Sequence, residues 1–337
     1  MAESGVPSEV KKKAKKSIRP LIGLVVLIGC FVFAGLHFKE VAEFLSVLEH
    51  ANPWWVALAV LLQVLTYFCS GGIFYEILRA AKSKVPLKRL AELSIERMSV
   101  NQLAPAAGLS GHAYVFVALR RFNVSRGTAA EAVFIDTMSF YIGYAISVVL
   151  VLGIVLGLHE ASPLIIGALL LFLLIAAFII GGIFWLFEYT NRELPRWMRR
   201  IAILDEVARS LKAARPERIS APWVLSITSF YEFLVFALDG ATLWAVMQII
   251  NVPLEITVCF SVFILASIAG SLSLLPGGVG GFEAACVLAL RWFGVDLGAA
   301  LTATLLLRGL TLWFPLIPGS ILAAKYVVIR DEEDEFA

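Results

Sequence analysis

Six long apolar runs lie along the chain, and they restrict its fold more than any other feature of the sequence. The first is Leu21–Phe38, and the others lie at about 54–80, 128–158, 163–189, 222–250 and 298–328. A helix needs roughly 20 residues to cross a bilayer core. Hydrophobic residues make up 60% of the chain and charged residues 16%, whereas soluble proteins have about 25% charged residues. Because a backbone in lipid has to satisfy its own hydrogen bonds, the sequence predicts an all-α polytopic membrane protein with about six full transmembrane helices.

A segment of the chain occurs twice. Residues 103–132 recur without a gap 171 positions later, at 274–303, with 11 identities in 30 positions. Average residue usage would give about 3. Each copy reads as an apolar helical run, a break with Pro and Gly, and a second helix. A repeated broken segment in a membrane protein points to a transport site, so we predict two repeats, at about 54–158 and 222–329. A duplication that now serves only packing is the alternative.

The basic residues indicate the topology. They cluster at 11–19, 79–89, 120–126 and 192–218, and basic loops favour the cytoplasmic side. All four clusters lie inside if Leu87–Phe122 enters and leaves the membrane on the cytoplasmic side. We therefore predict a re-entrant helical hairpin there, with two thin full spans as the alternative. The second copy, Leu254–Phe293, then enters from the outside, which gives inverted repeats.

These assignments divide the chain into few parts. We expect a basic cytoplasmic N-terminus at 1–20, one integral membrane domain at 21–330 with an amphipathic cytoplasmic loop at 190–220, and an acidic tail at 331–337. The chain should lie in the cell (inner or plasma) membrane with both termini in the cytoplasm. Its four cysteines are far apart in sequence and have no metal-ligand spacing. We expect no metal and no cofactor.

The break in the second copy has the composition of an anion site. It contains Pro276, Gly277, Gly278 and Gly280 just before a helix that should begin near Gly281. Glycines adopt backbone angles closed to other residues, and the free N–H groups of a helix start suit an anion such as a lipid phosphate. The segment has neither the Gly-Lys-Ser/Thr of a P-loop nor the serine of a nucleophile elbow.

The same segment resembles a known family. Residues 275–283, Leu-Pro-Gly-Gly-Val-Gly-Gly-Phe-Glu, are similar to the hallmark of the lysylphosphatidylglycerol synthase transmembrane (flippase-like) family, as are 101–105, Asn-Gln-Leu-Ala-Pro, followed by Gly108. The resemblance implies a polytopic bacterial or archaeal protein associated with moving lipids between leaflets. In bifunctional members a cytosolic aminoacyl-transferase domain follows. This chain ends seven residues after Arg330, so we do not expect an enzyme.

Ionisable residues inside the membrane are costly and mark candidate sites. Arg308 lies well inside the last apolar run, and the family pattern makes Glu283 its expected partner, with Asp136 and Glu232 as open options. Either Arg308 binds a phosphate or it forms a structural ion pair, and Glu283 can also be a simple helix-start residue. His112 occupies the slot that matches Glu283, where it can handle protons or be an interior histidine. The predicted substrate-binding residues are Asn101, Pro105, Gly108, His112, Pro276, Gly277, Gly278, Gly280, Glu283 and Arg308, with Asp136, Glu232 and Asp239 as secondary candidates.

The function that fits these features is translocation of an anionic or isoprenoid-linked lipid between leaflets. One alternative is a membrane enzyme or accessory protein that acts on lipid-linked sugars or phosphates. Another is a non-transporting scaffold for a separate lipid synthase. The expected partners are membrane lipids with an anionic headgroup, and either a second copy of the chain or a separate lipid-modifying enzyme. We expect no nucleic acid partner.

Overall fold

The computed structural model describes residues 51–103, 109–157, 162–190, 221–273 and 276–333. Within these ranges every regular element is helical. The expected first span, the basic N-terminus, the loop at 191–220 and the end of the acidic tail lie outside them. The long helices are α3 (Pro53–Ala80), α6 (Arg126–Gly157), α7 (Pro163–Thr190), α10 (Pro222–Ile249) and α14 (Phe314–Glu333); the shorter ones are α4 (Leu87–Leu103), α5 (Leu109–Arg121), α11 (Ile256–Leu272), η2 (Pro276–Gly278), α12 (Gly281–Trp292), α13 (Leu297–Arg308) and η3 (Gly309–Trp313).

Five helical stretches of the described residues are long and apolar enough to cross a membrane. They are Pro53–Ala80, Arg126–Gly157, Ile165–Gly182, Pro222–Ile249 and Leu297–Ala323. They coincide with five of the six predicted spans and confirm an all-α, multi-pass membrane protein. The sixth, Leu21–Phe38, is outside the described residues, so the count of six stays a prediction.

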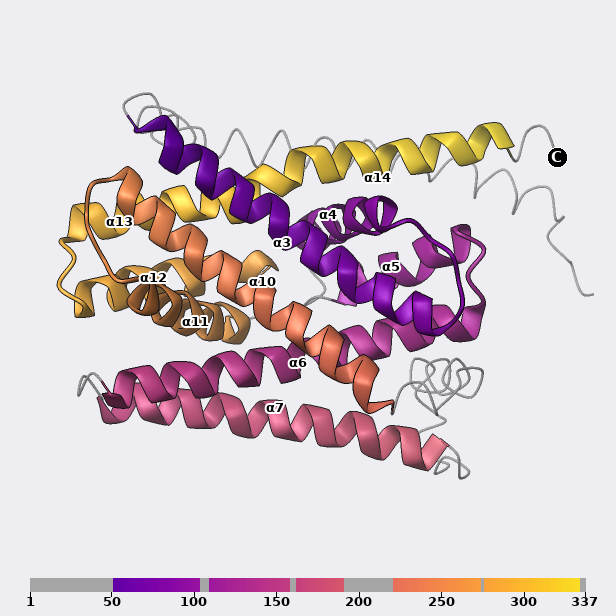
Figure 1. Ribbon diagram of the computed structural model, residues 1–337, viewed down its shortest axis with the longest axis horizontal. Helices are drawn as coiled ribbons and strands as arrows, with labels where there is room; N and C mark the ends of the chain where they lie inside the picture. Colours follow the sequence, from indigo (N-terminus) through magenta and orange to yellow (C-terminus); the bar gives the residue numbers. More distant parts are fainter. Residues whose placement is uncertain (1–50, 104–108, 158–161, 191–220, 274–275, 334–337) are drawn as a thin grey trace, which may run out of the picture.

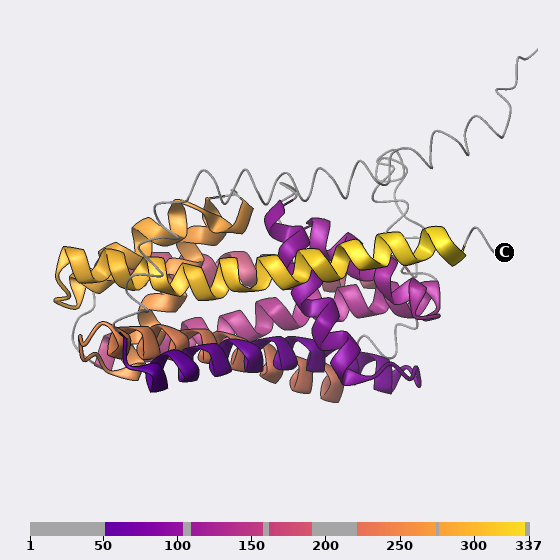
Figure 2. The same ribbon diagram turned by 90° about the horizontal axis from the view of Figure 1, so that it is seen from above.

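Two pairs of short helices lie at opposite ends of the molecule. The first pair, α4 and α5, occupies one end, and the second, α11 and α12, occupies the other (Figures 1 and 2). Within each pair the two helices contact each other. The long helices α3 and α10 pack side by side along the axis that joins these ends (Figure 1). The arrangement agrees with two helical hairpins, but whether each enters and leaves on one side of a membrane stays a prediction.

The helix boundaries reproduce the sequence repeat. Shifting α6 forward by 171 residues places its first residue, Arg126, on Leu297, the first residue of α13. The caps agree as well: Ser125 Oγ accepts a hydrogen bond from Thr128 N, and Asp296 Oδ2 accepts one from Ala299 N. The turns before them contain Asn123 with φ 59° and Gly294 with φ 81°. The local backbone chemistry of the two copies is therefore the same where the second helix of each pair ends.

Helix α4 is polar, but other helices cover it. Its sequence includes Glu96 and Arg97, and it packs between α3 and α14. Ser99 Oγ donates to the carbonyl of Pro315 at 3.0 Å. A Cβ atom on Gly319 would lie 2.0 Å from Ser99 Oγ, so the contact requires glycine there. If α4 enters the membrane, as the predicted hairpin requires, its charged residues are tolerated because other helices rather than lipid cover them.

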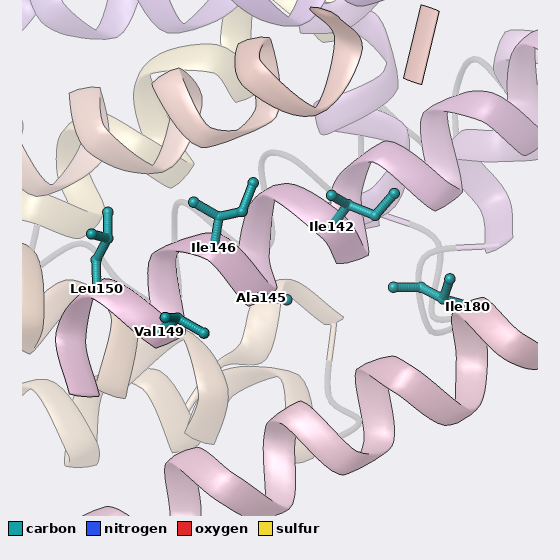
Figure 3. A pocket seen from close by; sticks show the side chains of 6 residues that line it. All are labelled: Ile142, Ala145, Ile146, Val149, Leu150 and Ile180. Carbon is teal, nitrogen blue, oxygen red and sulfur yellow. The ribbon is translucent and has the colours of Figure 1, made fainter. Parts of the chain in front are cut away.

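The lipid-facing side of α6 is hollowed by two apolar grooves. One lies between α6 and α7 and has a volume of about 430 Å³; the residues that line it are Ile142, Ala145, Ile146, Val149, Leu150 and Ile180 (Figure 3). The other, of about 540 Å³, lies between α6 and α10, where Ser226 and Ser229 add polar atoms to its wall. In a membrane these grooves face the acyl chains.

Candidate functional site

Arg308 is the centre of the candidate site at the second helix break. Its Nε donates to Glu283 Oε1 at 2.5 Å, and its NH2 group donates to the carbonyl of Gly277 at 2.6 Å. The guanidinium also lies 4.5 Å from the centre of the Phe282 ring. The Arg308 side chain is 12% exposed and that of Glu283 is 34% exposed. The contact expected between Arg308 and Glu283 is therefore present, at a position with limited access.

The glycines of the break give the chain the shape that brings these groups together. Gly277, Gly278 and Gly280 have φ values of 63°, 66° and 82°, which side chains disfavour. A Cβ on Gly278 would also lie 3.0 Å from Gly270 Cα, so the break packs closely on α11. The backbone N–H of Gly280 donates to Glu283 Oε2 at 2.6 Å. Glu283 thus binds the start of α12 with one oxygen and Arg308 with the other.

A π-helical turn follows Arg308 directly. The five residues Gly309–Trp313 form η3, which separates α13 from α14 within one long span. Such π-turns insert a residue into an α-helix and occur often at functional sites. In the first repeat α6 is continuous across the matching positions. The interruption is therefore a property of the half that contains Arg308.

The second break touches the first helix pair. The turn η2 contacts α4, and a Cβ on Gly277 would lie 3.8 Å from Gln102 Cγ. Next to Gln102, Asn101 Oδ1 accepts a hydrogen bond from Gly111 N at 2.7 Å. Asn101 therefore binds the start of α5, while the next residue, Gln102, packs on the second break. The end of α4 in the first pair and the turn η2 of the second pair are therefore in contact.

The first half contains its own acid–base contact. His112 Nε2 on α5 lies 3.4 Å from Asp136 Oδ2 on α6, and Asp136 Oδ1 accepts a hydrogen bond from Arg97 NH1 at 2.8 Å. The side chain of Asp136 is 1% exposed and that of Arg97 14%. Arg97 also lies 5.7 Å from the centre of the Phe74 ring. Asp136 is thus a partner of Arg97 and His112, and its option as the partner of Arg308 is not realised.

The two halves place an acid–base contact at nearly corresponding positions. With the offset of 171 residues, His112 falls on Glu283, and Asp136 falls one residue before Arg308. In the first half the acid is on the long helix, and in the second half it is on the short one. Because His112 stands where the repeat has Glu283, a symmetric site was in doubt from the sequence. In the structure equivalent helices are in contact, with the acid and its partner exchanged.

The remaining secondary candidates differ in their surroundings. Glu232 on α10 is 5% exposed and lies close enough to Asp136 and Arg97 to interact electrostatically with both. Asp239, two turns further along, accepts a hydrogen bond from Gln63 Nε2 at 2.8 Å. Glu232 therefore belongs to the Arg97 cluster, whereas Asp239 forms a polar pair with α3.

Sequence reasoning missed Arg97. It lies eight residues before Pro105, inside the segment predicted to enter the membrane. A basic residue in such a segment is the signal by which the sequence could have identified it. Pro105 and Gly108 lie outside the described residues. Of Pro276 the structure describes the backbone, which begins the turn η2. Among the described residues no group of three or more His, Cys, Asp and Glu side chains could hold a metal ion.

Comparison with known families now identifies the chain. The family described as "Lysylphosphatidylglycerol synthase TM region" matches residues 21–319. The chain belongs to this family. The match spans both helix pairs and Arg308, and it confirms the resemblance drawn from the glycine-rich segment. This family member is thus a lipid-related multi-pass membrane protein.

The individual relatives have low sequence identity to this chain, but each similarity covers most of its length. A UPF0104 membrane protein from Methanothermobacter thermautotrophicus is 24% identical over 327 residues, which is 89% of this chain and 92% of that protein. Another, from Methanocaldococcus jannaschii, is 21% identical over 340 residues, 96% of this chain and 98% of that protein. A phosphatidylglycerol lysyltransferase from Staphylococcus haemolyticus is 22% identical over 297 residues, 86% of this chain but 31% of that protein.

Proposed function

We propose that this family member moves a lipid with an anionic headgroup between the two leaflets of the membrane. The observation that carries the proposal is Arg308, an almost buried cation at a glycine-rich break, next to the start of α12. A guanidinium has five N–H donors, and Glu283 and Gly277 take two of them. The other donors remain for phosphate oxygens, which guanidinium groups bind in pairs.

The surroundings of Arg308 support an anion over a neutral ligand. The helix start contributes its partial positive charge, and an isolated cation at this depth costs about 2.5–3.5 kcal/mol on insertion scales. Glu283 offsets that cost while the site is empty. A lipid phosphate can replace the Glu283 carboxylate beside the guanidinium. The apolar grooves along α6 offer a surface for the acyl chains of that lipid. The phosphatidylglycerol lysyltransferase among the relatives is named for an anionic lipid, which agrees with this class of substrate.

The placement of the helix pairs suggests how the lipid moves. They lie at opposite ends of the molecule (Figure 1), and the turn η2 of the second break contacts α4. If the hairpins enter from opposite faces, opening either pair exposes the same central site to one side, as in transporters with inverted repeats. In this mechanism no residue acts as a catalyst.

The test is a leaflet assay in vesicles that contain only the purified protein and a fluorescent anionic phospholipid. Wild-type protein should accelerate exchange of the probe between leaflets, and Arg308→Gln should abolish the acceleration. Arg291→Gln is the matched control, because Arg291 is an exposed residue of α12 whose Nη1 donates to the nearby Val295 carbonyl. Equal rates in empty vesicles and in vesicles with wild-type protein would refute transport.

The similarity to part of a lysyltransferase favours one other function, an accessory role beside a separate lipid-modifying enzyme. In that case the protein should bind the anionic lipid through Arg308 without moving it. Lipid binding that persists while the leaflet assay shows no exchange would support the accessory role.

A further inference from the structure

We propose that Arg97, His112, Asp136 and Glu232, here called the α4–α6 cluster, form a proton-binding site that is linked to the Arg308 site. These residues come from four helices, α4, α5, α6 and α10. They are separate from the groups that hold Arg308. The link to lipid movement rests on the proposed function, whereas the proton site itself does not.

The geometry leaves one buried oxygen poorly satisfied. Asp136 Oδ1 accepts from Arg97, but Asp136 Oδ2 is buried and accepts no hydrogen bond from the part of the chain that the structure describes. The nearest titratable nitrogen is His112 Nε2, at 3.4 Å. A buried acceptor without a partner is unfavourable. A proton shared between the imidazole and this carboxylate satisfies the oxygen and strengthens the contact, and the 26% exposure of the His112 side chain gives the proton a route from water.

The charges of the cluster lead to the same conclusion. With a neutral imidazole, the α4–α6 cluster contains one cation, Arg97, and two carboxylates, Asp136 and Glu232. Both carboxylates are at least 95% buried, since Asp136 is 1% and Glu232 5% exposed. A net negative charge in such a place is costly, and one added proton makes the cluster neutral. Because the groups interact, the proton belongs to the cluster as a whole rather than to one residue.

Other ionisable groups nearby do not supply the missing positive charge. On α3, Glu76 pairs with Arg79 at 2.6 Å. On α4, Glu96 accepts a hydrogen bond from Tyr114 of α5 at 2.7 Å. On α10, Asp239 adds a further negative charge near Glu232 and is bonded to Gln63. The described side chains of α7 and α11 that face α6 include no basic residue.

Direct contacts connect this cluster to the Arg308 site. His112 follows Gly111, whose N–H donates to Asn101 on α4. The next residue of α4, Gln102, packs against Gly277, and the Gly277 carbonyl accepts from Arg308. Both acid–base contacts join the second helix of a pair to the helix that follows it: α5 to α6 in the first half and α12 to α13 in the second. Movement of α5 on gain or loss of the proton would therefore reach the second break through the end of α4.

The test compares thermal unfolding of purified wild-type protein and Glu232→Gln in detergent between pH 6.5 and pH 8.5. If folded wild type holds the extra proton and the unfolded chain does not, stability is lost as pH rises. The Tm should fall by about 4 °C over this range. Glu232→Gln removes the excess negative charge, so its Tm should change far less. Glu255→Gln, the same change at an exposed residue, should keep the wild-type slope. Glu232→Met removes the charge without an amide and is used if the glutamine variant does not fold.

Equal pH slopes in wild type and in the charge-free Glu232 variant would overturn the proton site, whatever the leaflet assay shows. Arg308→Gln should keep the wild-type slope, because it leaves the α4–α6 cluster intact. If the slope differs as expected but no variant or wild type moves lipid, the proton site stands and the proposed function fails. With both correct, the exchange rate of wild type depends on pH, and that of Glu232→Gln does not.

Discussion

Removal of the Arg308 guanidinium separates a structural role from a ligand-binding role. Arg308→Gln breaks the ion pair with Glu283 and the bond to the Gly277 carbonyl. Breaking a fully buried pair costs about 3–5 kcal/mol. Here Glu283 is 34% exposed and keeps its bond from Gly280 N, so water and the helix start stabilise the remaining carboxylate. We expect a loss of about 2 kcal/mol, the size of one hydrogen bond to a charged group, and a fall in Tm of about 4 °C.

A double-mutant cycle combines Arg308→Gln with Glu283→Gln and with the variant that carries both changes. Each protein is measured for Tm and for binding of an anionic phospholipid. If the residues pair, the double variant should regain about half of the lost stability. Lipid binding should be absent in Arg308→Gln and in the double variant, but present in Glu283→Gln, which leaves the guanidinium free for phosphate. Normal lipid binding by Arg308→Gln would refute the ligand role, and additive losses of stability would refute the pairing.

Three further predictions concern other parts of the molecule. Gly280→Val should insert in the membrane but abolish lipid exchange, since φ is 82° there; normal exchange would mean that the break tolerates side chains. In a cysteine-free background, Ser83→Cys and Ser125→Cys should both react with an impermeant thiol reagent from the cytoplasmic side only, and labelling of Ser125→Cys from outside would contradict the first hairpin. Hydrogen bonds from Ala299 N and Gly298 N hold the pKa of the Asp296 carboxyl below its ordinary value, so Asp296→Ala should lower the Tm at pH 7. That difference should shrink as the pH falls below about 3.9, the ordinary pKa of aspartate, because the unfolded chain then binds a proton more readily than the folded one. A pH-independent difference would contradict this account.

The sequence predicted the helices well because lipid leaves a backbone few choices. Apolar runs placed five described spans, and the repeat placed both breaks to within a few residues, including the start of α12 at Gly281. The pairing of Glu283 with Arg308 was also predictable, because both belong to neighbouring helices of one repeat. These features depend on local composition and on residues that lie close together in the sequence.

Contacts between distant segments were not predictable. The bond from Arg97 to Asp136 joins α4 to α6, and the approach of Gly277 to Gln102 joins the second break to the end of α4. Periodicity says which side of a helix is polar, but not which partner it meets. The π-turn after Arg308 was hidden for a similar reason, since it depends on how the last span packs rather than on a residue type that marks it.

The covering of α4 by α14 has a consequence for biogenesis. Ser99 bonds to Pro315, more than two hundred residues later in the chain. Until the ribosome has released that last span, the side of α4 that carries Ser99 lacks the helix that covers it in the folded protein. The N-terminal half therefore cannot complete its packing during synthesis. The packing around α4 is finished only after α14 has been made. Premature termination before α14 would damage the first half of the protein as well as the last.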